Sequence, residues 1–214
     1  MSLKILSIGS ERNLFVNNSE AQKRIKEYGK LFEELHVIVF SNVKLGYKNF
    51  NLGNNIFIYP TNHKYKILYL WPIYKITKDL FSKSYKLKAK SWVITCQDSA
   101  EAGLAGWLLK MLFGAPLQFQ IHADIFSPYF WQESFKNKIL VLLAKFLLPK
   151  ANGIRVVSER IKQSLKAKSS QLKAEPVVLP IFVDVKKIQA QKVKVDLHQK
   201  YSELFEPHQL CMVV

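Results

Sequence analysis

Short apolar runs alternate with stretches of helical periodicity along this sequence, and this alternation constrains the fold more than any other feature. Between most of the runs, apolar residues recur three or four positions apart, as they do on one face of a helix. Strands that alternate with helices form a parallel sheet with right-handed crossovers. The sequence therefore predicts an α/β fold whose parallel sheet has helices on both faces. The expected strands are residues 4–9, 35–40, 55–60, 91–95, 117–121, 153–157 and 177–183.

Capping and breaking residues predict where the helices begin and end. Serine and aspartate accept hydrogen bonds from the free N–H groups of a first helical turn, whereas proline suits a first turn and ends a helix further along. Glycine adopts the left-handed conformation that follows many helices. The predicted starts are Ser19, Pro72, Asp98, Ser134 and Ser158, and the predicted stops are Gly114 and Pro149.

The composition is that of a globular and strongly basic chain. Of 214 residues, 49% are hydrophobic and 22% charged, which argues against extensive disorder. The net charge of +16 favours an anionic partner, such as a phosphate ester, a nucleic acid or an acidic membrane surface.

Only two cysteines are present, Cys96 and Cys211, and they lie far apart in the sequence. No disulfide framework is therefore expected, which fits a reducing compartment. Residues 1–12 lack a signal-peptide pattern, and we expect a cytoplasmic protein.

The carboxy-terminal part of the sequence differs from the rest. Residues 184–207 are polar and rich in lysine, and residues 210–214 form an apolar run. We expect one domain over residues 1–184, a linker over 185–209, and the first strand of a second domain, otherwise missing from this chain, over 210–214. The alternative is that the last run returns to the first sheet as an edge strand.

The most informative site candidate lies in the stretch LQFQIHADIFSP, where an apolar run stops at His122 and Asp124. In parallel sheets the ligand crevice lies beyond the carboxyl ends of the strands, so side chains at this position can reach a ligand. The alternatives are structural, because a histidine can satisfy a strand-end backbone group and an aspartate often caps a turn. A metal site is not expected, since no cluster of ligands completes the three or four positions that a metal needs.

Polar residues follow three other expected strands and are candidates for substrate binding. Arginine and backbone N–H groups after the first strand could bind a phosphate or an acceptor. Ser158 and Glu159 have a structural alternative as the cap and first turn of a helix, as Asp98 does beside Gln97. The substrate-binding candidates are Ser10, Arg12, Asn13, Gln97, Ser158 and Glu159, together with Asp124.

Lysines dominate residues 44–90, where ten lysines face a single acidic residue, Asp79. A solvated helix explains them without any function. A basic face with interfacial aromatics would instead bind an anionic membrane surface, and lysines with stacking aromatics would bind nucleic acid. We rank nucleic acid last, because no recognisable nucleic-acid-binding module is present. The candidate membrane-surface residues are Lys64, Lys66, Trp71, Lys75, Lys78 and Lys86.

Four strings, in this order along the chain, resemble the amino-terminal domain of glycosyltransferase family 4. They are SEAQKRIKEYGKLFEELHVIVFS, QIHADIFSPYF, GIRVVSERIKQSL and VVLPIFVD, and together they cover the chain to about residue 184. Two features depart from the family pattern: Gly9 is the only glycine in the loop GSERNLFVNN, and Pro180 is followed by Ile181 and Phe182 rather than by asparagine and glycine.

The resemblance implies a Rossmann-like domain that forms the amino-terminal half of a GT-B architecture. Enzymes of this family are retaining and use a nucleotide-sugar donor as substrate, without a cofactor or required metal. The resemblance implies that this domain holds a glycan or lipid-linked acceptor, with His122 at the cleft near the transferred sugar. A second domain would bind the nucleotide sugar, so this chain alone would be inactive or nearly so. Such an enzyme would act in cell-envelope or polysaccharide synthesis, at the inner face of the membrane.

A competing hypothesis is a non-catalytic Rossmann-like module that attaches to an anionic membrane through residues 64–90 or docks a partner chain. A nicotinamide-dependent dehydrogenase is weaker, because no GxGxxG motif follows the first strand.

Overall fold

The computed structural model describes residues 3–83, 91–169, 172–181 and 189–190. The chain divides into two compact units, Met1–Pro180 and Ile181–Val214. The first unit contains the sheet and the helices described below. Almost all of the predicted linker and all of the predicted final strand lie outside the described residues, so these domain boundaries stay a prediction.

A single eight-stranded sheet organises the first unit, in the order β3-β4-β2-β1-β5-β6-β7-β8. All neighbouring strands are parallel except the edge pair β3 and β4, which is antiparallel. The strands are β1 Lys4–Gly9, β2 Glu34–Val39, β3 Phe50–Asn51, β4 Ile56–Pro60, β5 Trp92–Cys96, β6 Leu117–Ile121, β7 Gly153–Val156 and β8 Pro176–Val178.

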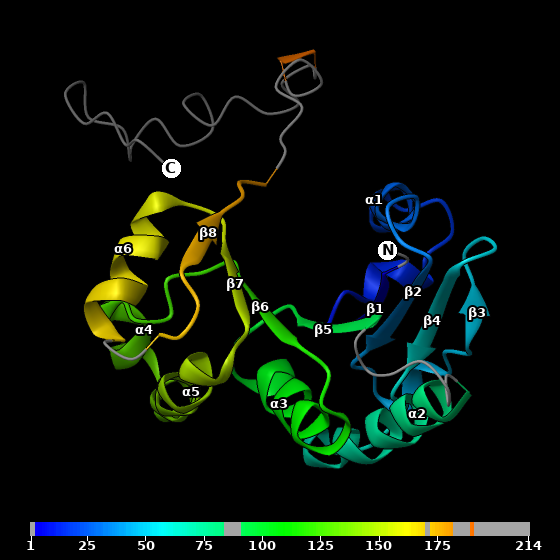
Figure 1. Ribbon diagram of the computed structural model, residues 1–214, viewed down its shortest axis with the longest axis horizontal. Helices are drawn as coiled ribbons and strands as arrows, with labels where there is room; N and C mark the ends of the chain where they lie inside the picture. The colour runs from blue at the N-terminus through cyan, green and yellow to red at the C-terminus, as the bar shows by residue number, and fades with distance from the viewer. Residues whose placement is uncertain (1–2, 84–90, 170–171, 182–188, 191–214) are drawn as a thin grey trace, which may run out of the picture. The chain divides into compact units, whose positions relative to one another are not determined.

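Helices lie on both faces of this sheet, as Figure 1 shows. The helix α1 lies on one side, and α2, α3 and α5 form a row on the other. The α-helices are α1 Glu20–Gly29, α2 Leu70–Lys83, α3 Glu101–Phe113, α4 Pro128–Glu133, α5 Phe135–Leu147 and α6 Glu159–Lys168. Single 3-10 turns are η1 Arg12–Phe15, η2 Val43–Leu45, η3 Lys66–Tyr69 and η5 Leu148–Lys150. Among the helices that the structure describes, none has the combination of length and hydropathy that crossing a bilayer requires.

The structure confirms the predicted α/β class and six of the seven strands to within one residue at either end. The seventh begins at Pro176 and ends as a strand at Val178, while part of its predicted range lies outside the described residues. The start predicted at Pro72 is wrong, because α2 begins two residues earlier, at Leu70. Proline fits inside a first turn, where its missing N–H has no helical partner in any case.

Side-chain hydrogen bonds at the predicted caps explain where several helices begin. The hydroxyl of Ser19 accepts from the N–H of Gln22 at 3.2 Å, and that of Ser134 accepts from the N–H of Asn137 at 3.1 Å. The helix start predicted at Asp98 is wrong by two residues, because Ala100 is the N-cap of α3, although the Asp98 carboxylate accepts from the backbone N–H groups of Ala100 and Ala102 at the start of that helix. These bonds fix the loops that follow β5 and precede α1 and α5.

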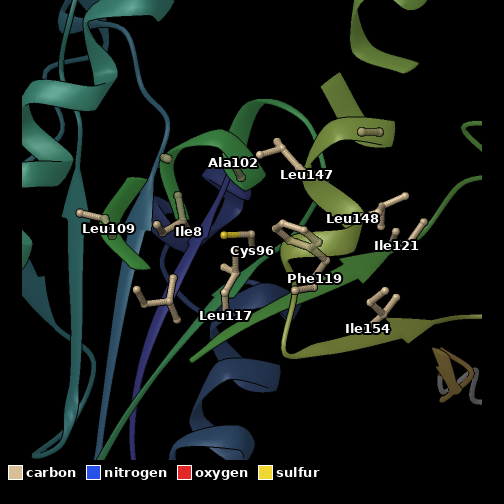
Figure 2. Packing of buried hydrophobic residues seen from close by; sticks show 14 of the residues in the cluster. Ile8, Cys96, Ala102, Leu109, Leu117, Phe119, Ile121, Leu147, Leu148 and Ile154 are labelled. Carbon is tan, nitrogen blue, oxygen red and sulfur yellow. The ribbon is translucent and has the colours of Figure 1, made fainter. Parts of the chain in front are cut away.

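The sheet separates two apolar cores. The larger one lies between the sheet and the row of α2, α3 and α5, and the smaller one lies on the side of α1. Figure 2 shows Ile8, Cys96, Leu117 and Phe119 within the larger core. Burial raises the pKa of the Cys96 thiol well above its ordinary value, so Cys96 is a packing residue rather than a nucleophile.

Candidate functional site

The carboxyl ends of β1 and β5 define the centre of the candidate site. In the sheet, β2 and β4 lie on one side of β1, and the later strands β5 to β8 lie on its other side. The direction in which the chain adds strands therefore reverses between β1 and β5. Gly9 ends β1, and the Gln97 side chain lies so close that a Cβ on Gly9 would overlap it. The backbone N–H of Gln97 donates to the carbonyl of Ile8 at 3.0 Å. Ligands bind at such reversal points in α/β sheets, and this makes Gln97 well placed for contact.

The loop after β1 carries three of the predicted substrate-binding residues, Ser10, Arg12 and Asn13, all exposed. Arg12 Nε donates to the carbonyl oxygen of Phe40, just beyond β2, at 3.2 Å. This bond holds the guanidinium of Arg12 at the carboxyl edge of the sheet. The backbone of Asn13 donates to the Glu11 carboxylate and accepts from the Ser19 hydroxyl, which ties the loop to the start of α1.

His122 directly follows β6 and is exposed at the same edge. Its pKa lies below the ordinary value of 6.5, first because protein atoms partly desolvate the ring and then because Arg155 and Arg24 place positive charge nearby. The ring is therefore mainly uncharged at neutral pH. An uncharged imidazole can both donate and accept a hydrogen bond.

Two arginines that the sequence reasoning did not select act on His122. Arg24 lies on α1, where it pairs with Glu11 at 3.3 Å. Arg155 lies on β7, where its guanidinium donates to Gln120 on β6 and to the carbonyl of Leu179 after β8. The sequence GIRVV could have indicated Arg155, because it lies between apolar residues of a predicted strand. Side chains alternate along a strand, so Arg155 is on the opposite face from Ile154 and Val156.

Asp124 and Ser158 make structural contacts. The Asp124 carboxylate accepts from the Ser164 hydroxyl at 2.7 Å, which links the loop after β6 to α6. The Ser158 hydroxyl accepts from the N–H of Ile161 at 3.4 Å and caps α6, while Glu159 is exposed in its first turn. All three residues lie beyond the carboxyl ends of β6 and β7, and their roles in binding stay predictions.

The structure thus brings Ser10, Arg12, Gln97, His122 and Ser158 to one edge of the sheet, although their sequence positions span most of the chain. Hydrogen-bonding groups and positive charges are both present there. Such an edge can bind a hydroxylated ligand that carries phosphate. Within the described ranges, no three His, Cys, Asp or Glu residues are grouped as a metal site would need.

Replacing Arg155 with glutamine is expected to raise the pKa of His122 toward its ordinary value. A nearby positive charge disfavours protonation of the imidazole, so removing it makes protonation easier. The measurement is an NMR titration of the His122 ring protons. Arg160→Gln on α6 is the matched control, and an equal shift in both variants, or none in either, would refute the influence of Arg155.

The predicted membrane-surface residues follow the carboxyl end of β4, in the loop before η3, in η3 itself and on α2. The side chains of Lys64, Lys66, Lys75 and Lys78 are exposed, and Trp71 is 60% exposed. Lys75 Nζ lies 5.5 Å from the centre of the Trp71 ring. Lys86 lies outside the described residues. This placement leaves the predicted membrane contact open to test.

Comparison with known proteins identifies the fold. The sequence matches no protein-family model and no curated protein. Sucrose-phosphate synthase from Thermosynechococcus elongatus has a similar structure, with a TM-score of 0.58 at 14% identity over 95% of this chain and 99% of that chain. UDP-GlcNAc 2-epimerase from Methanocaldococcus jannaschii gives a TM-score of 0.51 at 16% identity over 82% of this chain and 45% of that one. The chain therefore spans less than half the length of the epimerase.

These similarities confirm the predicted Rossmann-like α/β fold and its GT-B type. Membership of glycosyltransferase family 4 in particular stays a prediction.

Proposed function

We propose that this chain is the acceptor-binding part of a retaining glycosyltransferase, which moves a sugar from a nucleotide-sugar donor to a glycan or lipid-linked acceptor. In this proposal a second Rossmann-like domain supplies most donor contacts, so the described domain alone has little or no activity. The reaction belongs to cell-envelope or polysaccharide synthesis at the cytoplasmic face of a membrane. It uses no cofactor and requires no metal.

The observation that carries the proposal is the position of His122 at the carboxyl edge, where partial burial and the charges of Arg155 and Arg24 lower the pKa of its ring. A neutral imidazole can hydrogen-bond a sugar hydroxyl without repelling the cationic charge that develops on a sugar ring during transfer. The flanking arginines attract a phosphate group, which both a nucleotide sugar and a lipid-linked acceptor carry. The two functions of the edge, sugar contact and phosphate attraction, are therefore served by different side chains.

The solved structures with this fold support a nucleotide-sugar reaction. One is named for the synthesis of sucrose phosphate, and another for epimerisation of UDP-GlcNAc, which is a nucleotide sugar. The four sequence strings that resemble the amino-terminal domain of glycosyltransferase family 4 support the assignment of this chain to the acceptor side.

The test is a transfer assay on the enzyme that contains this domain, with a panel of nucleotide sugars and lipid-linked acceptors. We expect a product whose new glycosidic bond keeps the anomeric configuration of the donor, as NMR of the product would show. Inversion of that configuration would refute the retaining mechanism, and an absence of transfer to every acceptor would refute the proposed function.

A further inference from the structure

The outer side of the helical layer exposes several large apolar side chains to solvent. These side chains are separate from the candidate site. On α5, four apolar residues recur at helical spacing and face outward: Phe135, Ile139, Leu142 and Phe146. Phe135 is 77% exposed, Leu142 is 57%, and the other two are 50%. We call these four residues the α5 stripe. The opposite side of the same helix buries Val141, Ala144 and Leu147 in the core.

The neighbouring helix α3 extends this apolar surface. The Trp107 ring on α3 packs edge-on against Phe146, with ring centres 5.4 Å apart. Met111 and Leu112, at the carboxyl end of α3, are 68% and 63% exposed. The α5 stripe therefore continues across α3 without a polar boundary at the Trp107 contact.

On the far side of α3 the surface continues to α2 through an apolar hollow of about 390 Å³. Leu108 and Leu112 line it from α3, and Trp71 and Tyr74 line it from α2. Figure 1 shows α2, α3 and α5 side by side on one side of the sheet. We call the combined surface of Trp71, Leu112 and the α5 stripe the helical face. Exposed apolar surfaces of this extent mark sites of interaction.

Lysines surround the helical face and define its charge. The sequences of α2, α3 and α5 contain seven lysines and two acidic residues, which gives a net charge of +5. Lys136 and Lys145 are exposed on α5, and Lys150 Nζ lies 3.8 Å from the centre of the Phe146 ring. One of the two acids, Glu101, already pairs with Lys66 at 3.0 Å and with Lys136 at 3.8 Å. The unbalanced charge is positive.

We propose that the helical face docks on an anionic lipid bilayer, with its apolar side chains in the headgroup region and its lysines against lipid phosphates. Aromatic rings beside lysines suit the boundary between water and lipid, and a basic amphipathic surface binds anionic bilayers. This inference extends the predicted membrane contact at Trp71 to α3 and α5, and its test does not depend on the proposed function, because no residue of the helical face belongs to the candidate site.

Charge argues against two other occupants. A second copy of this chain in a two-fold contact would bring two faces of the same positive charge together. Residues 181–214 of this chain contain five lysines and four acidic residues, so they carry no net negative charge to complement the face.

The helical face also lies beside the edge that carries His122. The helices α3 and α5 follow the carboxyl ends of β5 and β6, so both begin at the edge of the sheet where the candidate site lies. A bilayer bound on the helical face would therefore lie close to that edge. An acceptor anchored in this bilayer could then reach the candidate site.

The test is sedimentation of the chain with phosphatidylcholine vesicles that contain phosphatidylglycerol, compared with pure phosphatidylcholine vesicles. We expect binding to the anionic vesicles to be at least about tenfold stronger and to weaken with added salt. The double variant Ile139→Gln/Leu142→Gln should lose about tenfold in binding, because both side chains are exposed and their replacement removes apolar contact with lipid.

Matched controls lie on the side of α1. Val16→Gln/Leu31→Gln changes two apolar residues that are 55% and 74% exposed, and it should bind vesicles as the unmodified chain does. Lys136→Gln/Lys145→Gln should weaken binding severalfold more than Lys23→Gln/Lys26→Gln on α1, although both pairs remove two exposed lysines.

A second readout reports the orientation of the bound chain. Lipids brominated on their acyl chains should quench the fluorescence of the unmodified chain more than that of Trp71→Phe, because Trp71 is exposed on the helical face. Equal losses of vesicle binding in Ile139→Gln/Leu142→Gln and in its control on the side of α1 would overturn the proposal. A failure to bind anionic vesicles would also overturn it, and a dimer that Ile139→Gln/Leu142→Gln dissociates would then show that the face binds a second copy.

Discussion

Replacing His122 with alanine is expected to lower the rate of sugar transfer by about one to two orders of magnitude in the enzyme that contains this domain. The loss corresponds to one hydrogen bond to a charged or developing-charge group, about 1.5–3 kcal/mol, and each ~1.4 kcal/mol is a factor of ten in rate. The fold should be unaffected, because His122 is exposed after β6. The measurement is kcat/KM for the acceptor, together with the thermal midpoint of unfolding.

Lys26→Ala on α1 is the control for this variant. Its side chain is exposed on a helix, and neither proposal gives it a role. The variant should retain full activity and the same thermal midpoint. If His122→Ala transferred sugar at the unmodified rate, the role assigned to the imidazole would be wrong, whatever the binding affinity of the acceptor.

Replacing Gly106 with alanine is expected to destabilise the protein by about 2 kcal/mol, although alanine favours a helix by about 1 kcal/mol over glycine. Gly106 lies on α3 where the helix meets the sheet, and a Cβ there would overlap Cys96 Sγ and lie 2.8 Å from Leu117 Cδ1. Both neighbours are buried in the larger core, so neither can move into solvent (Figure 2). The measurement is the free energy of unfolding in a denaturant titration.

Two comparisons isolate the cause of that destabilisation. Gly153→Ala on β7 should change the free energy of unfolding by less than about 1 kcal/mol, because the nearest atom to the added Cβ is 3.6 Å away. Cys96→Ala removes the sulfur, so Gly106→Ala should lower the free energy of unfolding less in that background than in the unmodified chain. If the two substitutions changed the free energy of unfolding additively, the contact with Cys96 would not be the source of strain.

The sequence was most informative where local physics decides the structure. The run at 4–9 corresponds to β1, which is buried at every position after Lys4, and the run at 117–121 corresponds to β6, whose apolar residues alternate with two half-buried glutamines. The caps at Ser19 and Ser134 form the expected bonds, since each needs only a neighbouring N–H group. The position of His122 at a strand end followed from the same reasoning.

The features that sequence reasoning missed depend on contacts between distant residues. The two-residue strand β3 exists through its pairing with β4, and nothing in Phe50–Asn51 alone marks a strand. The Arg24 and Arg155 charges reach His122 from elements far away in the chain. Asp124 meets Ser164 only after α6 folds back onto the loop.

The α5 stripe was missed for a related reason. Residues 135–147 read as a strongly apolar helix, and composition does not show which side the sheet will cover. The sheet side takes up Val141, Ala144 and Leu147, and this leaves Ile139 and Leu142 outside. The exposed stripe therefore follows from the orientation of α5 in the helical layer.

The most direct test of the acceptor-site assignment is NMR chemical-shift mapping on this chain with soluble analogues of lipid-linked saccharides. We expect the resonances of Ser10, Gln97 and His122 to shift together on addition of an acceptor, because the ends of β1, β5 and β6 meet at one edge of the sheet. A nucleotide sugar alone should cause smaller shifts. Saturable acceptor binding that leaves these three residues unshifted and is unchanged in His122→Ala would contradict the assignment of the acceptor site.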